Sequence, residues 1–451
     1  MMKIYNNFSK KLYTRLNFYF SDELPCSKRK WLHLGQEENT NSLQKKELRI
    51  MQYNVLAPCY TYPNLYPDCT KQDLEWHARL DLLIKEIKFV DPTILCLQET
   101  QLDTLYDLND KLKDVIDVSV IHRLKGKSKK DGCTTIFKKE QYEEIYSVKL
   151  DLDQSSSNYS ELKWINCENI CLFTLLKDKK KPNSFILVGN THFIYSPQMG
   201  LVKLGQAKLI TSAIKSILET ESDKSIDVFL CGDFNFIPNS ALYSFFTQQS
   251  INFESLPLHE VSNQDIAYTF EKNENSIDQH FQNTTRRYQF FNNNKTQKEY
   301  IPYFQSLMGL EVKFDKKNLE FNVNFSKNEH FNNKNVITSD ICLKSAYAEM
   351  YKQYNQKFPN SKKSLINNLI SKISKKDNLT YEYGLSHLTK KGYLQCDFIW
   401  YKFAEPASQK HLKQILQQHD YQYVNKFKAF PNQSHPSDHF PIVASFELNE
   451  Q

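Results

Sequence analysis

The sequence predicts a layered α/β protein in which helices cover buried β-sheets. Short apolar runs of strand-forming residues recur along the chain, and amphipathic helical stretches lie between them, a mixture typical of this class. Apolar residues make up 40% of the 451 residues and aromatic residues 13%, which is enough for a sizeable core and excludes a wholly disordered chain. With 10 glycines and 15 prolines, collagen-like and glycine-rich repeat classes are also excluded.

The individual elements follow from these patterns in chain order. Apolar and polar residues alternate from Leu48 to Asn54, which predicts a strand that ends at Asn54. Asp73 has the position of an N-cap for the helix that follows. The short apolar run 93–97, followed by Glu99, is typical of a strand buried on both faces. Further strands are predicted at 134–137, 171–176, 185–188, 228–230, 398–401 and 442–446, with helices at 202–218 and 240–247.

Polar residues repeatedly follow the apolar strands. They are Asn54, Glu99, His192, the set Gly232-Asp233-Phe234-Asn235 and the set Ser437-Asp438-His439, and Asp397 follows a further short turn. Taken singly, each has a structural explanation: a surface glutamate, a hydrogen-bonded core histidine, or Asp and Asn residues in turns. Polar groups at the ends of buried strands are costly unless they are partnered, so their repeated placement there predicts one shared site.

Six segments in this order resemble the endonuclease/exonuclease/phosphatase superfamily, which has the DNase I-like fold. They are residues 51–57 (MQYNVLA), 95–99 (LCLQE), 189–192 (GNTH), 231–235 (CGDFN), 396–399 (CDFI) and 437–441 (SDHFP). The resemblance covers about residues 47 to 448. It implies a four-layer α/β/β/α sandwich, made of two packed mixed sheets flanked by helices.

Within the superfamily, the chain is most similar to the deadenylase-related branch, and in that branch to the Angel proteins. The segments that carry this similarity are 131–133 (DGC), 202–206 (VKLGQ), 343–347 (LKSAY) and 29–31 (RKW). Two of them, with Lys203 and Ser345-Ala346-Tyr347, disfavour the lipid and inositol-phosphate phosphatases of the same superfamily.

The resemblance implies a role for each residue of the predicted site. Glu99 would be the main ligand of Mg²⁺, or of Mn²⁺ in its place, with Asn54 beside it, since Mg²⁺ prefers a few hard oxygen ligands. Asp233 would orient or deprotonate the attacking water. The remaining members would be Asn235, His192 and His439 as donors to the phosphoryl oxygens, Asp438 as the residue that holds His439 in its tautomer, and Asp397 as a further acid.

The same resemblance bears on the substrate. Pro197, Asn235 and Tyr393 would contact it, with Pro197 against one face of the terminal base. In poly(A)-selective relatives an aromatic residue covers the other face, but here Gly392 has that position and Tyr393 follows it, which predicts weak adenine preference.

The implied function is Mg²⁺-dependent hydrolysis of RNA from its 3′ end, as a 3′-to-5′ exoribonuclease. The alternative is a 2′,3′-cyclic phosphatase of RNA ends, and motifs do not separate the two. A catalytically inactive RNA-binding or scaffold relative is disfavoured because Glu99, Asp233 and His439 are all present. The Leu-rich repeats of the large deadenylases are absent from this sequence, so docking through them is not expected.

Charge divides the chain into a tail and a domain. The net charge is 58 − 52 = +6. Residues 1–46 carry nine basic and four acidic side chains, or +5, which leaves about +1 for the rest. We predict a basic N-terminal tail over 1–46, either a mitochondrial transit peptide or a simple basic extension, and one domain over 47–449 with an Asn-rich insertion at about 263–335.

The ten cysteines and the hydropathy bear on location. No CxxC pair, secretory signal or transmembrane stretch is present in the sequence, and several cysteines lie within apolar runs. These features favour a reducing compartment and no membrane partner. The cytoplasm is the expected location, with the mitochondrion left open by the basic N-terminus.

Overall fold

The computed structural model describes residues 29–33, 47–113, 117–160, 162–181, 183–253, 256, 261–264, 300–325, 335–357, 386–389, 392–404, 410–419 and 421–448. Within these ranges, seven strands form one sheet in the order β1-β18-β19-β2-β3-β5-β4. Their bounds are β1 (Trp31–His33), β2 (Glu47–Asn54), β3 (Ile94–Gln101), β4 (Val118–Leu124), β5 (Asp131–Lys138), β18 (Lys410–Leu416) and β19 (Ile442–Leu448). Only β2 and β3 are parallel among the neighbouring pairs described in this sheet.

A second sheet joins six of the described strands in the order β14-β17-β9-β8-β7-β6. Its members are β6 (Tyr142–Asp151), β7 (Ile170–Asp178), β8 (Ser184–His192), β9 (Ser225–Asp233), β14 (Lys344–Ser345) and β17 (Asp397–Lys402). Strands β8 and β9 are parallel and the other described pairs are antiparallel, so both sheets are mixed. The two sheets pack face to face around a core that includes Ile50, Cys96, Ile186, Phe229 and Ile442.

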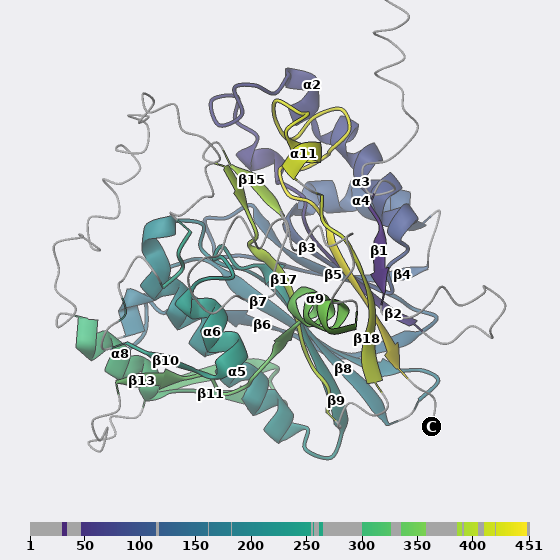
Figure 1. Cartoon of the computed structure of the whole chain (residues 1–451). Coiled ribbons are helices and arrows are strands. Elements are labelled where there is room, and N and C mark those ends of the chain that lie inside the picture. The colour runs from purple at the N-terminus through teal and green to yellow at the C-terminus, as the bar shows by residue number, and fades with distance from the viewer. Residues whose placement is uncertain are drawn as a thin grey trace, which may run out of the picture.

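Helices cover the two outer faces (Figure 1). Helices α3 (Trp76–Val90) and α4 (Leu102–Lys113) pack on the seven-stranded sheet, where Met51 and Leu95 face Leu83 and Leu108. Helices α5 (Gly200–Thr220) and α6 (Ala241–Gln248) cover the six-stranded sheet. Alternate residues of one strand thus enter different layers, as Ile50 and Met51 do. The predicted four-layer sandwich is confirmed.

The remaining described elements are short or lie at the margins. The helices are α2 (Lys71–Leu74), α8 (Ile301–Met308), α9 (Ala346–Lys357) and α11 (Tyr421–Val424), with 3-10 turns at 58–60, 162–164 and 197–199. Three two-stranded pairs complete the set: β10 (Ser250–Asn252) with β13 (Val336–Thr338), β11 (Leu310–Asp315) with β12 (Glu320–Phe325), and β15 (His387–Thr389) with β16 (Gly392–Leu394).

The folded part of the chain begins before residue 47. Residues 29–33 lie in the segment predicted to be a tail, but β1 pairs with β18 and Leu32 is buried. The guanidinium of Arg29 donates to the carbonyl oxygens of Gln417 (2.5 Å), Pro441 (2.7 Å) and Leu416 (3.2 Å). The rest of the predicted tail, and with it the transit-peptide prediction, lies outside the described residues.

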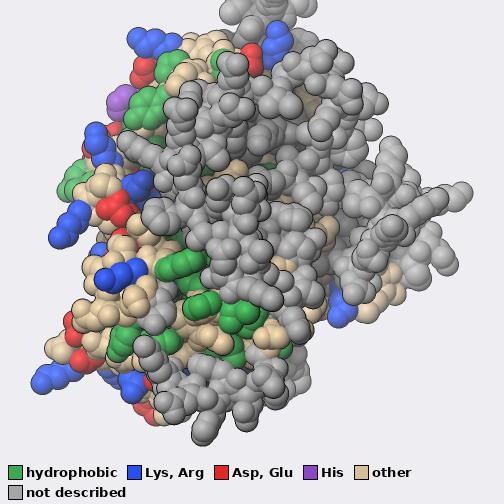
Figure 2. All heavy atoms as spheres, turned by 90° about the vertical axis from the view of Figure 1, so that its left-hand side faces the viewer, with side chains coloured by type: hydrophobic (Ala, Val, Ile, Leu, Met, Phe, Trp, Pro, Cys, Tyr) green, Lys and Arg blue, Asp and Glu red, His purple; other side chains and the backbone are tan. Residues whose placement is uncertain are grey.

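The predicted insertion also contains ordered structure. Within 263–335, the described residues 300–325 form α8 and the β11–β12 hairpin. Leu310, Val312 and Phe314 alternate along β11 and join the core above the six-stranded sheet. The alternation of apolar and polar residues along 310–315 is the pattern of a strand, and the surrounding charged residues obscured it in the sequence. Figure 2 views the side of the molecule on which α6 and α8 lie in Figure 1, and shows hydrophobic side chains gathered there.

The start of the first predicted helix differs from the expectation. Thr70, not Asp73, is the N-cap of α2, and Asp73 is the third residue of a capping box in which Thr70 Oγ accepts from Asp73 N–H. Helix α3 then begins at Trp76, with Glu75 as an N-cap that makes no side-chain hydrogen bond.

Candidate active site

One end of the sandwich collects the polar ends of strands from both sheets. Asn54 ends β2, His192 ends β8 and Asp233 ends β9. Because β8 and β9 are parallel with His192 opposite Asp233, these two side chains end at the same edge. Strand β17 runs the other way, so its first residue, Asp397, lies opposite Asp233. The predicted shared site therefore follows from strand direction.

Glu99 enters the site through a distortion of its strand. Strand β3 continues to Gln101, and the pairing with β5 shifts register between Gln98 and Thr100. Glu99 has a φ of 60° at this point, a left-handed conformation that is unfavourable for glutamate and is found where function requires it. Its carboxylate accepts hydrogen bonds from Asn54 Nδ2 (3.0 Å) and Ala57 N–H (3.0 Å). Burial raises the pKa of Glu99 to about 7.

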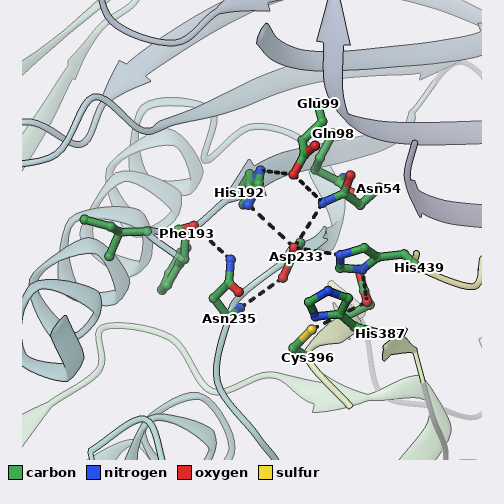
Figure 3. A network of polar contacts seen from close by, with 12 residues as sticks. Asn54, Gln98, Glu99, His192, Phe193, Asp233, Asn235, His387, Cys396 and His439 are labelled. Carbon is green, nitrogen blue, oxygen red and sulfur yellow. Dashed lines mark hydrogen bonds and ion pairs between the residues drawn. The ribbon is translucent and has the colours of Figure 1, made fainter. Parts of the chain in front are cut away.

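Asp233 lies at the centre of the cluster (Figure 3). Its Oδ2 accepts from Asn54 Nδ2 (3.1 Å) and lies 3.5 Å from His192 Nε2 and 3.6 Å from His439 Nε2. Burial, and then the charge of Asp397, raise the pKa of Asp233. A buried carboxylate with a raised pKa and two imidazole neighbours is suited to accept a proton.

His439 is held by Asp397, not by Asp438 as the sequence predicted. Its Nδ1 lies 2.9 Å from Asp397 Oδ2. Asp438 instead accepts a hydrogen bond from Tyr66 Oη (2.9 Å) and lies 3.6 Å from His387 Nε2. Burial alone would lower the pKa of His439, but the charges of Asp397 and Asp233 raise it to about 10. His439 is therefore an imidazolium at neutral pH.

Asp438 has a supporting position behind this pair. Burial would raise its pKa, but the hydrogen bond from His387 and the charge of His439 lower it to about 2. The His387 ring stacks on the His439 ring, with centroids 4.0 Å apart and an interplanar angle of 8°. Although Asp438 is next to His439 in the sequence, its carboxylate contacts Tyr66 and His387, and the motif alone does not reveal this.

Lys125 is a site residue that the sequence analysis missed. Its ammonium contacts Asp131 Oδ2 (2.6 Å) and His192 Nδ1 (3.1 Å), and all three side chains are buried. An ammonium can only donate, so His192 Nδ1 accepts and Nε2 carries the proton. Burial and the charge of Lys125 lower the pKa of His192 well below its ordinary value. His192 is thus a neutral Nε2–H donor, in contrast to His439.

Asn235 also has partners that the motifs did not indicate. It has a φ of 50°, and its Nδ2 donates to the carbonyl of Phe193 (3.1 Å). Its Oδ1 accepts from Gln264 Nε2 (3.2 Å), and Gln264 Oε1 accepts from Lys203 Nζ (2.5 Å). Gln264 and Lys203 therefore fix the orientation of the Asn235 amide.

Pro197 and Tyr393, two of the three predicted substrate-binding residues, have no described contact with the cluster around Asp233, whereas Asn235 lies within it. Pro197 begins the 3-10 turn 197–199, is half-buried, and its carbonyl accepts from Ser262 Oγ (3.2 Å). Gly392 and Tyr393 belong to β16, which pairs with β15. Beyond this backbone position, the side chain of Tyr393 lies outside the described structure, and its predicted contact with the base stays a prediction.

Comparison with known proteins places these features in a family. The sequence profile of the endonuclease/exonuclease/phosphatase family matches residues 51–439. The chain belongs to this family. The match spans Asn54 to His439 and so contains the whole cluster. Divalent-metal dependence is general in the family.

The curated relatives of this chain include Angel proteins and an exoribonuclease subunit. Protein angel homolog 2 of Mus musculus is 29% identical over 257 residues, 53% of this chain and 46% of that protein. The human counterpart is 30% identical over 230 residues, 50% and 41% of the two chains. The CCR4-Not complex 3′-5′-exoribonuclease subunit Ccr4 of Saccharomyces cerevisiae is 23% identical over 443 residues, which cover 92% of this chain and 40% of that protein. The chain spans less than half the length of these relatives.

Solved structures show the same fold. ANGEL2, described as a 2′,3′-cyclic phosphatase and bound to adenosine-2′,3′-vanadate, has a TM-score of 0.66 at 23% identity, covering 94% of this chain and 99% of that one. The catalytic domain of human Nocturnin has a TM-score of 0.50 at 16% identity, and the match covers 94% of this chain and 99% of that domain. These structural similarities confirm the predicted fold, and the family profile and the curated relatives confirm the predicted superfamily and its Angel-like branch.

The residues present fit a hard divalent cation near Glu99. The amide of Asn54 joins two carboxylates, the mostly buried Glu99 and the fully buried Asp233. Neighbouring acidic groups add to the raised pKa of each carboxyl, so this end of the site lacks positive charge that a cation would supply. Asn54 fits less directly than predicted, because its Oδ1 accepts from Leu56 N–H (3.1 Å) and its nitrogen faces the carboxylates. Glu99 is thus the better candidate ligand, and Asn54 as placed bridges the two acids.

A second group of potential ligands lies nearby. His387, Cys396 and His439 have ligand atoms within 4.8 Å of one another, as do Asp233, Asp397 and His439. The parallel stack of the two imidazoles prevents both from directing a ring nitrogen at one ion.

Among the helices that the structure describes, none is long and apolar enough to cross a membrane.

Proposed function

We propose that this chain hydrolyses phosphodiester bonds at the 3′ ends of RNA in a Mg²⁺-dependent reaction. The observation that carries the proposal is the single connected cluster at the sheet edge, in which Asn54 joins Glu99 to Asp233 and Asp233 lies between His192 and His439. The name of one relative, a 3′-5′-exoribonuclease subunit, supports RNA as the substrate class.

Each residue has a role that its surroundings support. Glu99 would hold Mg²⁺, which supplies Lewis-acid stabilisation of a phosphoryl oxygen when it is bound. Asp233 accepts the proton of the attacking water, because its raised pKa makes it the stronger base. The His439 imidazolium donates from Nε2, and neutral His192 donates from Nε2, to the charge that develops on the phosphoryl oxygens.

The supporting residues hold these groups in their protonation states. Asp397 keeps His439 charged, and Lys125 keeps His192 neutral with Nε2 protonated. Asn235, oriented by Gln264, offers its second amide hydrogen to the substrate. The site thus has one base and two donors whose pKa values are set apart by their neighbours.

The second candidate reaction is removal of a 2′,3′-cyclic phosphate from an RNA end. Its support is the 29–30% identity to angel homolog 2 proteins, together with the description of ANGEL2 as a 2′,3′-cyclic phosphatase. Both reactions break one P–O bond of a diester by attack of water, so the same base and donors serve either.

A side-by-side assay tests the proposal and separates the two reactions. Purified protein is offered RNAs of one sequence that end in a 3′-hydroxyl or in a 2′,3′-cyclic phosphate, with Mg²⁺ or with EDTA. Shortening of the first RNA supports the exonuclease, and conversion of the second to a monophosphate without shortening supports the phosphatase. If neither RNA changes while the protein is folded by circular dichroism, the proposed function is wrong.

A further inference from the structure

The turn between β4 and β5 carries a concentration of positive charge next to the site. Residues 125–131 have the sequence KGKSKKD. Lys125 and Asp131 form the buried ion pair beside His192. The side chains of Lys127, Lys129 and Lys130 are exposed, and within the described residues no hydrogen bond or ion pair engages them.

This turn is held in a defined shape. Gly126 N–H donates to the Glu168 carbonyl (3.0 Å), Ser128 N–H donates to Glu168 Oε1 (3.0 Å), and Ser128 Oγ also donates to the Glu168 carboxylate. Lys129 N–H closes the turn on the Gly126 carbonyl (3.2 Å). The three exposed lysines therefore extend from an anchored loop, which lowers the conformational cost of binding.

The lysines are close to the reacting end of the site. Lys130 is five residue steps from Lys125, so its backbone lies at most about 18 Å from that of Lys125, whose side chain contacts His192. The backbone of Lys129 is tied back to Gly126, the residue next to Lys125, so the exposed lysines stay near that end of the turn. The charge of Asp131 offsets that of Lys125, and the charge of Glu168 offsets that of one exposed lysine. A local excess of about two positive charges therefore remains on the turn.

We propose that the β4–β5 turn, through Lys127, Lys129 and Lys130, binds the phosphodiester backbone of the RNA strand upstream of the 3′ end. This inference rests on the proposed function, and it deepens it by making a polynucleotide, not a mononucleotide, the preferred substrate. Unpaired lysines pair with phosphates as point charges without reading bases. Residues 47–451 together carry a net charge of only about +1, so these three lysines form a local excess on a nearly neutral domain.

The chain provides a matched control. Lys179, Lys180 and Lys181 lie in the β7–β8 turn, at the opposite end of the strand that ends in His192. The eight residue steps of β8 place that turn about 26 Å from His192. Replacing three lysines by alanine in either turn changes the net charge equally. Lys179 and Lys180 are exposed like the lysines of the β4–β5 turn, whereas Lys181 is half-buried and has an interaction of its own.

The test measures binding of a fluorescent single-stranded RNA, blocked at its 3′ end by a phosphorothioate linkage, over a range of salt. We expect the triple variant Lys127→Ala/Lys129→Ala/Lys130→Ala to reduce the slope of log K against log salt by up to about 2, from about 0.7 for each lost phosphate contact. The control variant of the β7–β8 turn should leave that slope within about 0.5 of the wild-type value.

Hydrolysis of a long RNA should show a raised KM with little change in kcat, and the defect should shrink on a dinucleoside monophosphate. Equal loss of affinity in both variants would overturn the proposal in favour of general charge attraction. An unchanged slope in the first variant would also overturn it, as would an equal kcat loss on both substrates, which would mean that the turn acts through His192. Because binding is measured without turnover, RNA bound by the turn but left uncleaved would instead contradict the proposed function.

Discussion

Replacing Asp397 by Asn tests whether this carboxylate keeps His439 charged. The variant preserves the shape of a fully buried side chain but removes the charge 2.9 Å from His439 Nδ1. A hydrogen bond to a charged group contributes about 1–2 kcal/mol more than a neutral one, which corresponds to about one pKa unit. The pKa of His439, about 10 in the wild type, should therefore fall to about 9 or below.

The sign of the effect follows from which form Asp397 favours. Asp397 stabilises the imidazolium, so without it His439 loses its proton at lower pH. If His439 must be charged to act, the alkaline limb of the kcat profile should move down by about one pH unit or more. The assay is RNA hydrolysis from pH 6 to about 10, with the unfolding temperature recorded for each protein.

Asp438→Asn is the matched comparison. Asp438 contacts Tyr66 and His387 and not His439, so its replacement should move the alkaline limb less than Asp397→Asn does. A larger shift from Asp438→Asn would refute the geometry and restore the expectation drawn from the sequence. Superimposable profiles for wild type and Asp397→Asn would refute the role of His439 as a charged donor.

Three further predictions concern neighbouring residues. Lys125→Met removes the cation that offsets burial at Glu99, so the pKa of Glu99 should rise above about 7 and the acidic limb of the rate profile should move to higher pH; an unmoved limb would contradict this. Arg79→Met leaves three buried carbonyl oxygens without their donor, those of Val55, Leu56 and Pro436, and should lower the free energy of unfolding by about 3–5 kcal/mol in urea titrations. The glycine at 392 predicts less than about tenfold preference for poly(A) over mixed RNA in a competition assay, and a strong preference would disprove it.

The strand ends show how far the sequence leads. Asn54, His192 and Asp233 could be brought together from sequence because each ends an apolar strand, and strand direction then decides where it lies. His439 is predicted to follow a strand as well, but it lies in the segment before β19 and reaches the same edge from the other direction. The two-sheet fold follows from the same runs through the resemblance. These inferences depend on chain order and periodicity, which a single sequence contains.

Other features depend on directions that a sequence does not contain. Asp397 and Asp438 are equally plausible partners for His439 until the antiparallel register of β17 with β9 is known. Lys125 lies in a basic run that is typical of a solvated turn, and only the fold shows that this one member points inward. The short strand β1, which contains Trp31, likewise forms only because it pairs with β18, almost 400 residues away in the sequence.

The most direct test of the central claim is the Glu99→Gln variant. The replacement keeps the size of the side chain and removes a buried charge whose pKa is already raised, so the unfolding temperature should stay equal or rise. Wild-type protein should process RNA 3′ ends with Mg²⁺, lose this activity in EDTA and regain it when Mg²⁺ is returned. The variant should be slower by about 100-fold or more. A wild-type rate in folded Glu99→Gln protein, or hydrolysis that persists in EDTA, would contradict the assignment of this cluster as a metal-dependent active site.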